Sequence, residues 1–319
     1  MNITQQNSLL GVLLADAAAL GLHWMYDLER LHQVVAQNAE KTPAFIRPDA
    51  AHYAGKVGYF AHAGKQAGEQ SHYGEAFLLN LGHLATEGEF RVRKFQQAFL
   101  SVFGPGGSYS GYIDKPTAVT LKNLQQMDLS LAADNSNSGS GADDQQIPAL
   151  TPVAALCVSL NQAALNDTVL ETAIRVTNNN DLAVACGLYF SRILLATLEG
   201  LSIADSFAHA SALMPAAMQE KMTMALDMET ANLDSAALTL GQSCDLLNTM
   251  PLVAYILKHS RSFKEAAEMN ILAGGDSCGR SIMLGAIAGA HYGIGTTEGI
   301  PCHWLFKLKR QTAIAGLLG

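Results

Sequence analysis

Charged side chains are scarce in this sequence of 319 residues. Asp, Glu, Lys and Arg together make up 15% of it, whereas hydrophobic residues make up 49%. Lys and Arg number 20 against 28 Asp and Glu, which gives a formal net charge of −8, and the basic residues form no stripe. This argues against a nucleic-acid-binding surface, which needs clustered Lys and Arg. The basic cluster at residues 307–310 is interpreted as a solvated helix face, and the apolar residues predict a large buried core.

Paired cysteines and long apolar runs are also missing. The five Cys are an odd number, and none forms a Cys-x-x-Cys pair. This predicts free thiols and a reducing compartment. No apolar run reaches about 18 residues without a polar interruption, so no membrane span is expected. The first residues lack the positive flank of a signal peptide. We therefore expect a soluble, cytoplasmic protein that binds neither membranes nor nucleic acid.

Alternating strand patterns are absent as well. Ala, Leu and Met are abundant, a composition that favours helix over strand. Residues suited to N-caps precede several apolar segments with helical periodicity. The sequence thus predicts an all-α fold in a single domain over residues 1–319. The expected helices cover residues 4–22, 75–87, 93–103, 116–127, 149–163, 167–176, 181–199, 203–212, 215–230, 247–259, 263–272, 279–291 and 301–309.

Two long stretches between these helices carry other signals. Residues 41–74 are punctuated by Gly and Pro, yet they contain several aromatic residues and His. A long connection of this kind is often functional, and we interpret it as an ordered cover over a cleft. Residues 131–146 are rich in Gly, Ser and Asp. They are either a flexible linker or a ligand loop whose backbone N–H groups wrap phosphates.

Two carboxylates stand in unusual surroundings. Asp16 interrupts the apolar helix expected at 4–22, and burying a carboxylate is costly unless it is paired or ligating. Asp16 either forms a buried hydrogen bond to the end of a neighbouring helix or serves as a functional acid. Asp276 follows a Gly-Gly turn that presents it at the mouth of a helix. Gly285 and Gly289 in that helix indicate the close approach of another helix or a ligand, because Gly costs a helix interior about 1 kcal/mol relative to Ala.

Six motifs in order resemble those of the ADP-ribosylglycohydrolase family (the dinitrogenase-reductase-activating glycohydrolase type). Residues 274–278, Gly-Gly-Asp-Ser-Cys, resemble its Gly-Gly-Asp-Thr-Asp-Thr signature, and residues 11–17 resemble its first-helix Gly-Asp-Ala motif. The other four are residues 71–78 at the place of Thr-Asp-Asp-Thr, 138–141 with 147–154 at the phosphate loop, 177–180 at Thr-His-x-x-Pro, and 300–304 at Ile-Pro-x-x-Trp. The resemblance implies an orthogonal multi-helix bundle with a cleft.

The resemblance also implies a metal-dependent activity. Members of the family typically hold two Mg²⁺ ions and cleave the bond between ADP-ribose and a protein or small acceptor. Mg²⁺ demands oxygen ligands in octahedral geometry, and a bound metal ion activates water. At the matching positions this sequence departs from the pattern: the two central acids of the first metal motif become His72 and Tyr73, the second acid of the last motif becomes Cys278, and the acid after the first-helix motif becomes His23. Most of the expected Mg²⁺ ligands are therefore replaced, while Asp276 is kept.

Two functions follow from the retained residues. The first is a glycohydrolase that cleaves an N- or O-glycosidic bond to ADP-ribose or a related nucleotide sugar. In it Asp276, Asp16 or Glu75 acts as the general base toward water. The second is a catalytically degenerate ADP-ribose-type binding protein or structural protein, because loss of the metal ligands removes the activation of water.

A third possibility is a different metal. If the family superposition holds, His23, His72, Asp276 and Cys278 converge on one place. Their mixed nitrogen, oxygen and sulfur donors suit Zn²⁺ or another transition metal.

The expected substrate is a small nucleotide sugar or an ADP-ribosylated molecule. Tyr112 is placed to stack on a base, with ordinary packing as the alternative. Asn178 stands where the family has its His. The acids at residues 143–144 are either solvated or in contact with a ribose. The expected phosphate cradle consists of Ser138, Gly139, Ser140 and Gly141.

Overall fold

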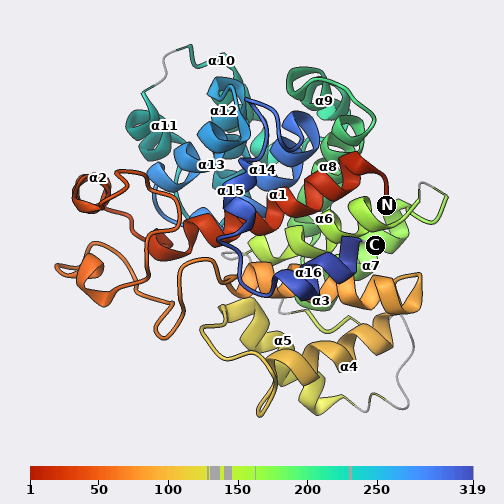
Figure 1. Ribbon diagram of the computed structural model, residues 1–319. Helices are drawn as coiled ribbons and strands as arrows, with labels where there is room; N and C mark the ends of the chain where they lie inside the picture. Colours follow the sequence, from red (N-terminus) through yellow and green to blue (C-terminus); the bar gives the residue numbers. More distant parts are fainter. Residues whose placement is uncertain (128, 130–136, 140–145, 162, 230–231, 319) are drawn as a thin grey trace.

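The computed structural model describes residues 1–319 except 128, 130–136, 140–145, 162, 230–231 and 319, and its described part is 66% helical without a strand (Figure 1). This confirms the predicted all-α class. The α-helices are α1 (Ile3–Ala19), α2 (Leu28–Gln37), α3 (His72–Glu87), α4 (Val92–Phe103), α5 (Lys115–Gln126), α6 (Leu150–Ser159), α7 (Asp167–Thr177), α8 (Asp181–Leu198), α9 (Ile203–Ala210), α10 (Gln219–Asp227), α11 (Leu233–Leu240), α12 (Leu246–His259), α13 (Phe263–Leu272), α14 (Ser277–Tyr292), α15 (Cys302–Leu305) and α16 (Gln311–Leu318). Short 3₁₀ helices lie at η1 (Leu20–Leu22), η2 (Ala50–Tyr53), η3 (Ile147–Ala149), η4 (Ser211–Leu213) and η5 (Ala216–Met218).

Most expected helices lie within a few residues of the observed ones, and the exceptions are short. Helices α2, α11 and α16 were not predicted. The helix expected at 215–230 is divided, because a 3₁₀ turn follows Pro215 and α10 starts only at Gln219. The helix expected at 301–309 is reduced to the four residues of α15. Short helices carry too little periodicity to be recognised from sequence.

The centre of the molecule is the pair formed by α1 and α14, which run side by side and are surrounded by other helices (Figure 1). Their backbones touch at glycines. A Cβ atom added to Gly285 would clash with the carbonyl oxygen of Gly11, and one added to Gly289 would clash with that of Asn7. The small residues of the second helix thus serve close contact with another helix, one of the two alternatives that the sequence offered.

A smaller layer lies to one side of this centre. Helices α4 and α5 form the lower edge of Figure 1, and α3 separates them from the central pair. They have their own apolar cluster, in which Phe95, Phe99 and Phe103 pack with Leu121 and Leu124. The C-terminal helix α16 lies against α3. The N-terminus of α3 therefore stands between the two layers, which is where the site is built.

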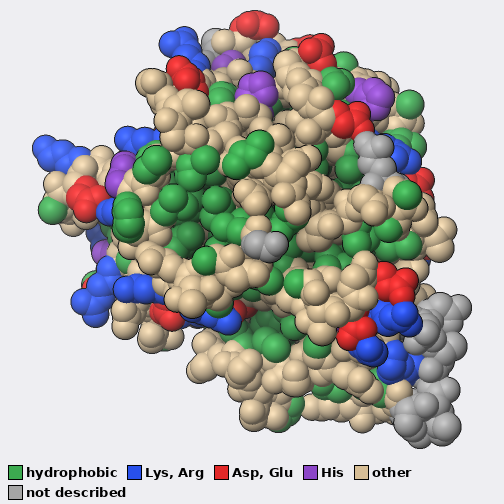
Figure 2. Space-filling model, turned by 45° about the vertical axis from the view of Figure 1, so that its right-hand side comes forward, with side chains coloured by type: hydrophobic (Ala, Val, Ile, Leu, Met, Phe, Trp, Pro, Cys, Tyr) green, Lys and Arg blue, Asp and Glu red, His purple; other side chains and the backbone are tan. Residues whose placement is uncertain are grey.

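Charged side chains are dispersed over the face of the molecule that Figure 2 draws. On the face drawn in Figure 2, Lys, Arg, Asp and Glu lie in small groups, with hydrophobic side chains visible between them. Among the described residues, one helix, α8, is long and apolar enough to cross a membrane by length and composition. Because 61% of that stretch is buried among other helices, it is a core helix, and no membrane protein is indicated.

Candidate functional site

The turn before α14 positions the central acid of the site. Gly274 and Gly275 have φ values of +69° and +61°, a left-handed conformation that Gly adopts without strain. The turn is fixed by the segment after η1, since Gly275 N–H donates to Met25 O and Trp24 N–H donates to Gly275 O, both at 2.7 Å. As a result, Asp276 is the N-cap of α14, as expected from the sequence.

Both carboxylate oxygens of Asp276 are engaged by the protein. Oδ1 accepts hydrogen bonds from His23 Nε2 at 2.8 Å and from Gly279 N–H at 2.9 Å. Oδ2 accepts one from the Tyr73 hydroxyl at 2.9 Å. The side chain is fully buried. Burial opposes its ionisation, yet the hydrogen bonds from His23 and Gly279 outweigh burial and lower the pKa of Asp276. Asp276 is therefore an ionised carboxylate surrounded by protein donors.

Asp16, the second retained acid, is held in the same manner by the start of α3. Its Oδ2 accepts from Ser71 N–H at 2.8 Å and its Oδ1 from the Ser71 hydroxyl at 2.5 Å. A Cβ at Gly74 would clash with this carboxylate. Burial raises the pKa of Asp16 to about 6, against the opposing effect of the Ser71 hydrogen bonds. Asp16 thus forms the buried hydrogen bonds to a neighbouring helix end that were one of its two interpretations, here with the N-cap residue of α3.

A histidine pair extends from Asp276 toward the loop that precedes α3. His23 Nδ1 lies 2.7 Å from His62 Nε2. Because His23 Nε2 faces the ionised carboxylate of Asp276, it carries the proton, so Nδ1 accepts and His62 donates through Nε2. Burial lowers the pKa of His23 and lowers that of His62 well below its usual value. Both rings are accordingly neutral. His62 was not among the predicted site residues.

His72 and Tyr73 fill the positions of the two family acids. Their rings lie 3.9 Å apart between centroids. His72 Nε2 is 3.3 Å from Asp114 Oδ2, without hydrogen-bond geometry. The His72 ring centroid is 6.2 Å from that of His23. In the described part of the chain, the ligand atoms that lie within 4.8 Å of one another are those of His23, His62 and Cys278. Of the four predicted metal ligands, His23 and Cys278 belong to this group, whereas His72 and Asp276 do not, and His62 joins it.

The Cys278 thiol is fully buried between α14 and α1. Its Sγ lies 3.6 Å from the carbonyl oxygen of Asp16, to which the thiol donates. Burial raises the pKa of Cys278 well above its usual value, and the nearby acids add to this effect. Without a metal the side chain is therefore a neutral thiol.

Aromatic side chains cover these buried groups. Trp24 lies edge-on to Tyr112 with ring centroids 4.9 Å apart, and Tyr59 lies 5.6 Å from Tyr112. Tyr59 is 56% exposed, whereas Trp24 is buried. Burial raises the pKa of Tyr112 to about 12, so its hydroxyl is neutral. His72 and Tyr73 also line a separate cavity of about 10 Å³, together with Asp114 and Thr177, which is room for about one water molecule.

Glu75, the third predicted acid, lies elsewhere. Its Oε2 accepts a hydrogen bond from Arg310 Nη1 at 2.6 Å. Both residues line a cavity of about 740 Å³, which Lys65, Tyr109 and Gly82 also border. The structure therefore pairs Glu75 with a surface Arg and does not bring it together with Asp276.

The predicted phosphate loop is described only in part, since Ser140 and Gly141 lie outside the described residues. The Ser138 hydroxyl donates to Val176 O at 2.8 Å, and Gly139 N–H donates to Arg175 O at 2.9 Å. Asn178 is fully buried at the C-terminal end of α7. These contacts hold residues 138–139 against α7, and phosphate binding there stays a prediction.

The residues present do not fit two Mg²⁺ ions. Mg²⁺ needs oxygen ligands with room for several waters. Both oxygens of Asp276 and both of Asp16 are already occupied by protein donors, and the groups around them are imidazole, phenol and thiol.

Comparisons with known proteins agree with the motifs. The ADP-ribosylglycohydrolase family matches residues 6–318. Two crystallins of Tripedalia cystophora, J1A and J1B, are each 24% identical to the chain; J1A aligns over 96% of the chain and 92% of its own length, and J1B over 95% and 91%. A solved structure described as an ADP-ribosylglycohydrolase-related protein complex has the same fold, with a TM-score of 0.74 at 15% identity over 99% of this chain and 95% of that one. The chain belongs to the ADP-ribosylglycohydrolase family.

Proposed function

We propose that this chain is a non-hydrolytic member of its family, in which the catalytic centre has become part of the buried core. The observation that carries the proposal is the state of the retained acids. Asp276 receives three hydrogen bonds from protein groups, and Asp16 receives two. A general base must lie within reach of the attacking water, whereas both acids are fully buried and face donors of the protein.

The burial of the acids supports the same conclusion. Asp16 and Asp276 are both fully buried, and neither of them lines the cavity of about 740 Å³ or the one of about 10 Å³. The relatives named crystallins, at 24% identity, are in keeping with a structural role for such a chain.

A second candidate function is binding of an ADP-ribose-type ligand without cleavage. It is favoured by the aromatic cover, because Tyr59 is exposed and Tyr112 lies beside it. Aromatic faces of this kind stack on bases. Such a ligand would bind outside the buried acids or would displace the cover.

The test is release of ADP-ribose from an ADP-ribosylated protein, measured without metal, with Mg²⁺ and with Zn²⁺. A hydrolytically active family member serves as the positive control. We expect no release above background in any condition. Release at a rate near that of the control would overturn the proposal and restore the glycohydrolase predicted from the motifs.

Calorimetry with ADP-ribose separates the two non-hydrolytic roles. No binding at millimolar ligand supports the structural role. Binding that is lost in Tyr112→Ala supports the second candidate.

We also infer a reducing, cytoplasmic setting. None of the five cysteines, all of which are described, forms a disulfide, and thiols stay reduced where glutathione and thioredoxin are present. Fractionation of cells that produce the protein tests this location.

A further inference from the structure

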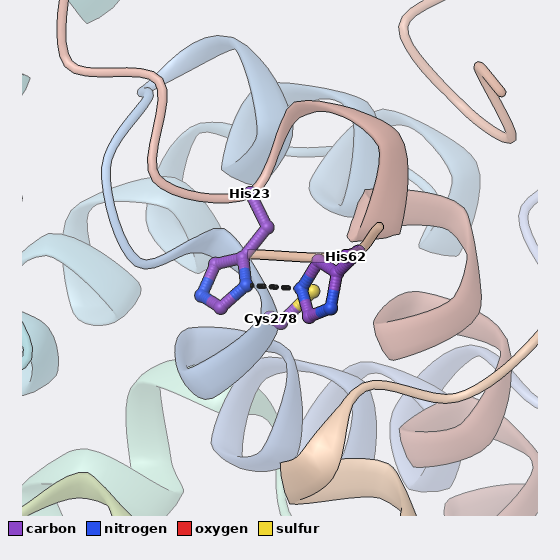
Figure 3. A group of neighbouring side chains, drawn as sticks. All are labelled: His23, His62 and Cys278. Atoms are coloured by element: carbon purple, nitrogen blue, oxygen red, sulfur yellow. Dashed lines mark hydrogen bonds between the residues drawn. The ribbon is translucent and has the colours of Figure 1, made fainter. Parts of the chain in front are cut away.

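We propose that His23, His62 and Cys278 form a binding site for a transition metal ion of the Zn²⁺ type. Each of them offers one ligand atom, and these atoms lie within 4.8 Å of one another. Figure 3 shows the two imidazole rings facing each other, with the sulfur beside the His62 ring. The proposal goes beyond the proposed function, because metal binding is measured without any glycosidic substrate.

The donor chemistry of the three residues points to this class of ion. Two imidazoles and one thiolate are the ligands that Zn²⁺ and similar ions take in proteins, whereas Mg²⁺ takes oxygen. Ring nitrogens bound to one tetrahedral Zn²⁺ stand about 3.3 Å apart, and a nitrogen and a sulfur about 3.6 Å apart, given bond lengths of roughly 2.0–2.3 Å. His23 and His62 approach to 2.7 Å in a hydrogen bond. Shifts of about 1 Å would therefore form the site.

Asp276 supplies the outer support that a metal-bound histidine requires. Histidines that ligate metal ions almost always donate their other ring N–H to a carboxylate or carbonyl. His23 Nε2 donates to Asp276 at 2.8 Å, which leaves Nδ1 for the metal. Asp276 is in turn held by Tyr73 and Gly279. The acid that is retained from the family motif thus acts through His23 and not as a direct ligand.

Metal binding would rearrange the protons of the site. His62 Nδ1 is buried and has no hydrogen-bond partner. When the metal binds, the His23–His62 hydrogen bond breaks and the His62 ring proton moves from Nε2 to Nδ1. The Cys278 thiol loses its proton to solvent as the sulfur–metal bond forms. Three protein ligands leave a fourth position, which we assign to a water molecule.

The metal would connect three segments that are far apart in the sequence. His23 follows η1, His62 lies in the connection before α3, and Cys278 begins α14. The connection between Ala54 and Ser71 contains no described helix and carries Tyr59 of the aromatic cover. A shared ion would therefore fix this cover to the central helix pair.

The experiment uses the full chain, purified without chelator. Metal content is measured by mass spectrometry. Zn²⁺ affinity is then measured by competition with a chromophoric chelator, and Co²⁺ is added as a spectroscopic probe. We expect one Zn²⁺ per chain and, with Co²⁺, the charge-transfer absorption of a metal–thiolate bond. Zn²⁺ should also slow proteolysis of the 54–71 connection.

Variants locate the ion. Cys278→Ser should abolish the charge-transfer band, and His62→Gln should lower Zn²⁺ affinity at least tenfold. Cys302→Ser is the matched control, because Cys302 is exposed and its loss should change neither readout. If Cys278→Ser does not fold, the proposal is tested by the Zn²⁺ affinity of His62→Gln and by the Co²⁺ spectrum of the unmodified chain. Absence of stoichiometric Zn²⁺, a Co²⁺ spectrum without thiolate character, or unchanged affinity in His62→Gln would overturn the proposal.

Discussion

Asp276 and Glu75 occupy two contrasting regions of the molecule. Asp276 lies in what we call the closed centre, the buried group formed by Asp16, His23, Tyr73, Asp276 and Cys278. Glu75 borders the side cavity, the space of about 740 Å³ that Arg310 also lines. In the closed centre every carboxylate oxygen is matched with a donor of the protein. In the side cavity the carboxylate is paired with a cation whose side chain is 56% exposed.

Under the proposed function, this difference is the way in which the family site loses its chemistry and keeps its fold. His72 and Tyr73 stand at the positions of the two central acids of the first metal motif, and the remaining acids, Asp16 and Asp276, have protein donors as partners. The side cavity measures about 740 Å³, and of the three predicted acids Glu75 alone lines it.

The largest expected effect comes from enlarging the helix contact beneath the closed centre. Gly285→Ala should lower the free energy of unfolding by about 3 kcal/mol or prevent folding, because its Cβ would clash with backbone of α1 that cannot move aside. Gly82→Ala at the side cavity is the matched control. No atom lies within 4 Å of its added Cβ, and we expect a gain of up to about 1 kcal/mol. Urea denaturation measures both, and equal effects would erase the contrast between the regions.

Asp16 should make the closed centre sensitive to pH. Its pKa is raised to about 6 in the folded chain from 3.8, so the folded state holds the proton more tightly than the unfolded state. The stability that protonated Asp16 gives to the folded state is therefore lost as pH rises from about 4 to about 6. Above that range the ionised side chain lowers the free energy of unfolding by about 3 kcal/mol relative to the protonated one. Asp16→Asn should remove this slope in a comparison of unfolding at pH 4.5 and 7. Glu220→Gln, an exposed acid of α10, should leave the slope in place; an unchanged slope in Asp16→Asn would contradict the assignment.

The Tyr73 hydroxyl should contribute a smaller amount to the same centre. Tyr73→Phe leaves Oδ2 of Asp276 without its donor, and an unsatisfied buried acceptor costs about 1–3 kcal/mol. Tyr189→Phe is the control, since its buried hydroxyl has no hydrogen-bond partner and its removal should be neutral or stabilising. The two midpoints of thermal unfolding are compared. A smaller loss for Tyr73→Phe than for Tyr189→Phe would refute the role of the hydroxyl.

The smallest effect belongs to the side cavity. Glu75→Gln breaks the ion pair with Arg310, and a partly exposed pair of this kind contributes less than about 1 kcal/mol. The difference from the unmodified chain should shrink further at 1 M salt, where charges are screened over about 3 Å. A loss above about 2 kcal/mol would mean that the side cavity is as tightly built as the closed centre.

The helical class and the close packing of α14 were accessible from sequence because they depend on local patterns. Gly285 and Gly289 sit one turn apart in an apolar segment, which indicates close packing on any neighbour. The partner, α1, was not identified, because contact between residues 280 apart leaves no local trace. The helices α2 and α16 were missed because they are short: their 10 and 8 residues give only two to three turns over which periodicity can be judged.

At the site, most of the residues selected from the motifs lie close together in the closed centre, but their individual contacts were not predicted. His72 was expected to ligate a metal with His23, yet its ring turns to Tyr73 and Asp114. His62 belongs to none of the six motifs, and the only signal it gave was its place in the aromatic connection 41–74. Which histidine of an irregular segment points inward is decided by tertiary packing, so sequence spacing alone could not select it.

The Asp276 carboxylate caps α14 through Gly279, orients His23 and accepts the Tyr73 hydroxyl. A routine knockout such as Asp276→Ala would therefore remove three structural contacts at once, one of which begins the central helix. Lost activity in that variant would not identify a catalytic acid, since a misfolded centre gives the same result. In relatives that share this arrangement, replacing the corresponding Asp by Ala would remove the acid and destabilise the fold in the same variant. Only substitutions that keep the N-cap hydrogen bond can separate a catalytic role from a structural one.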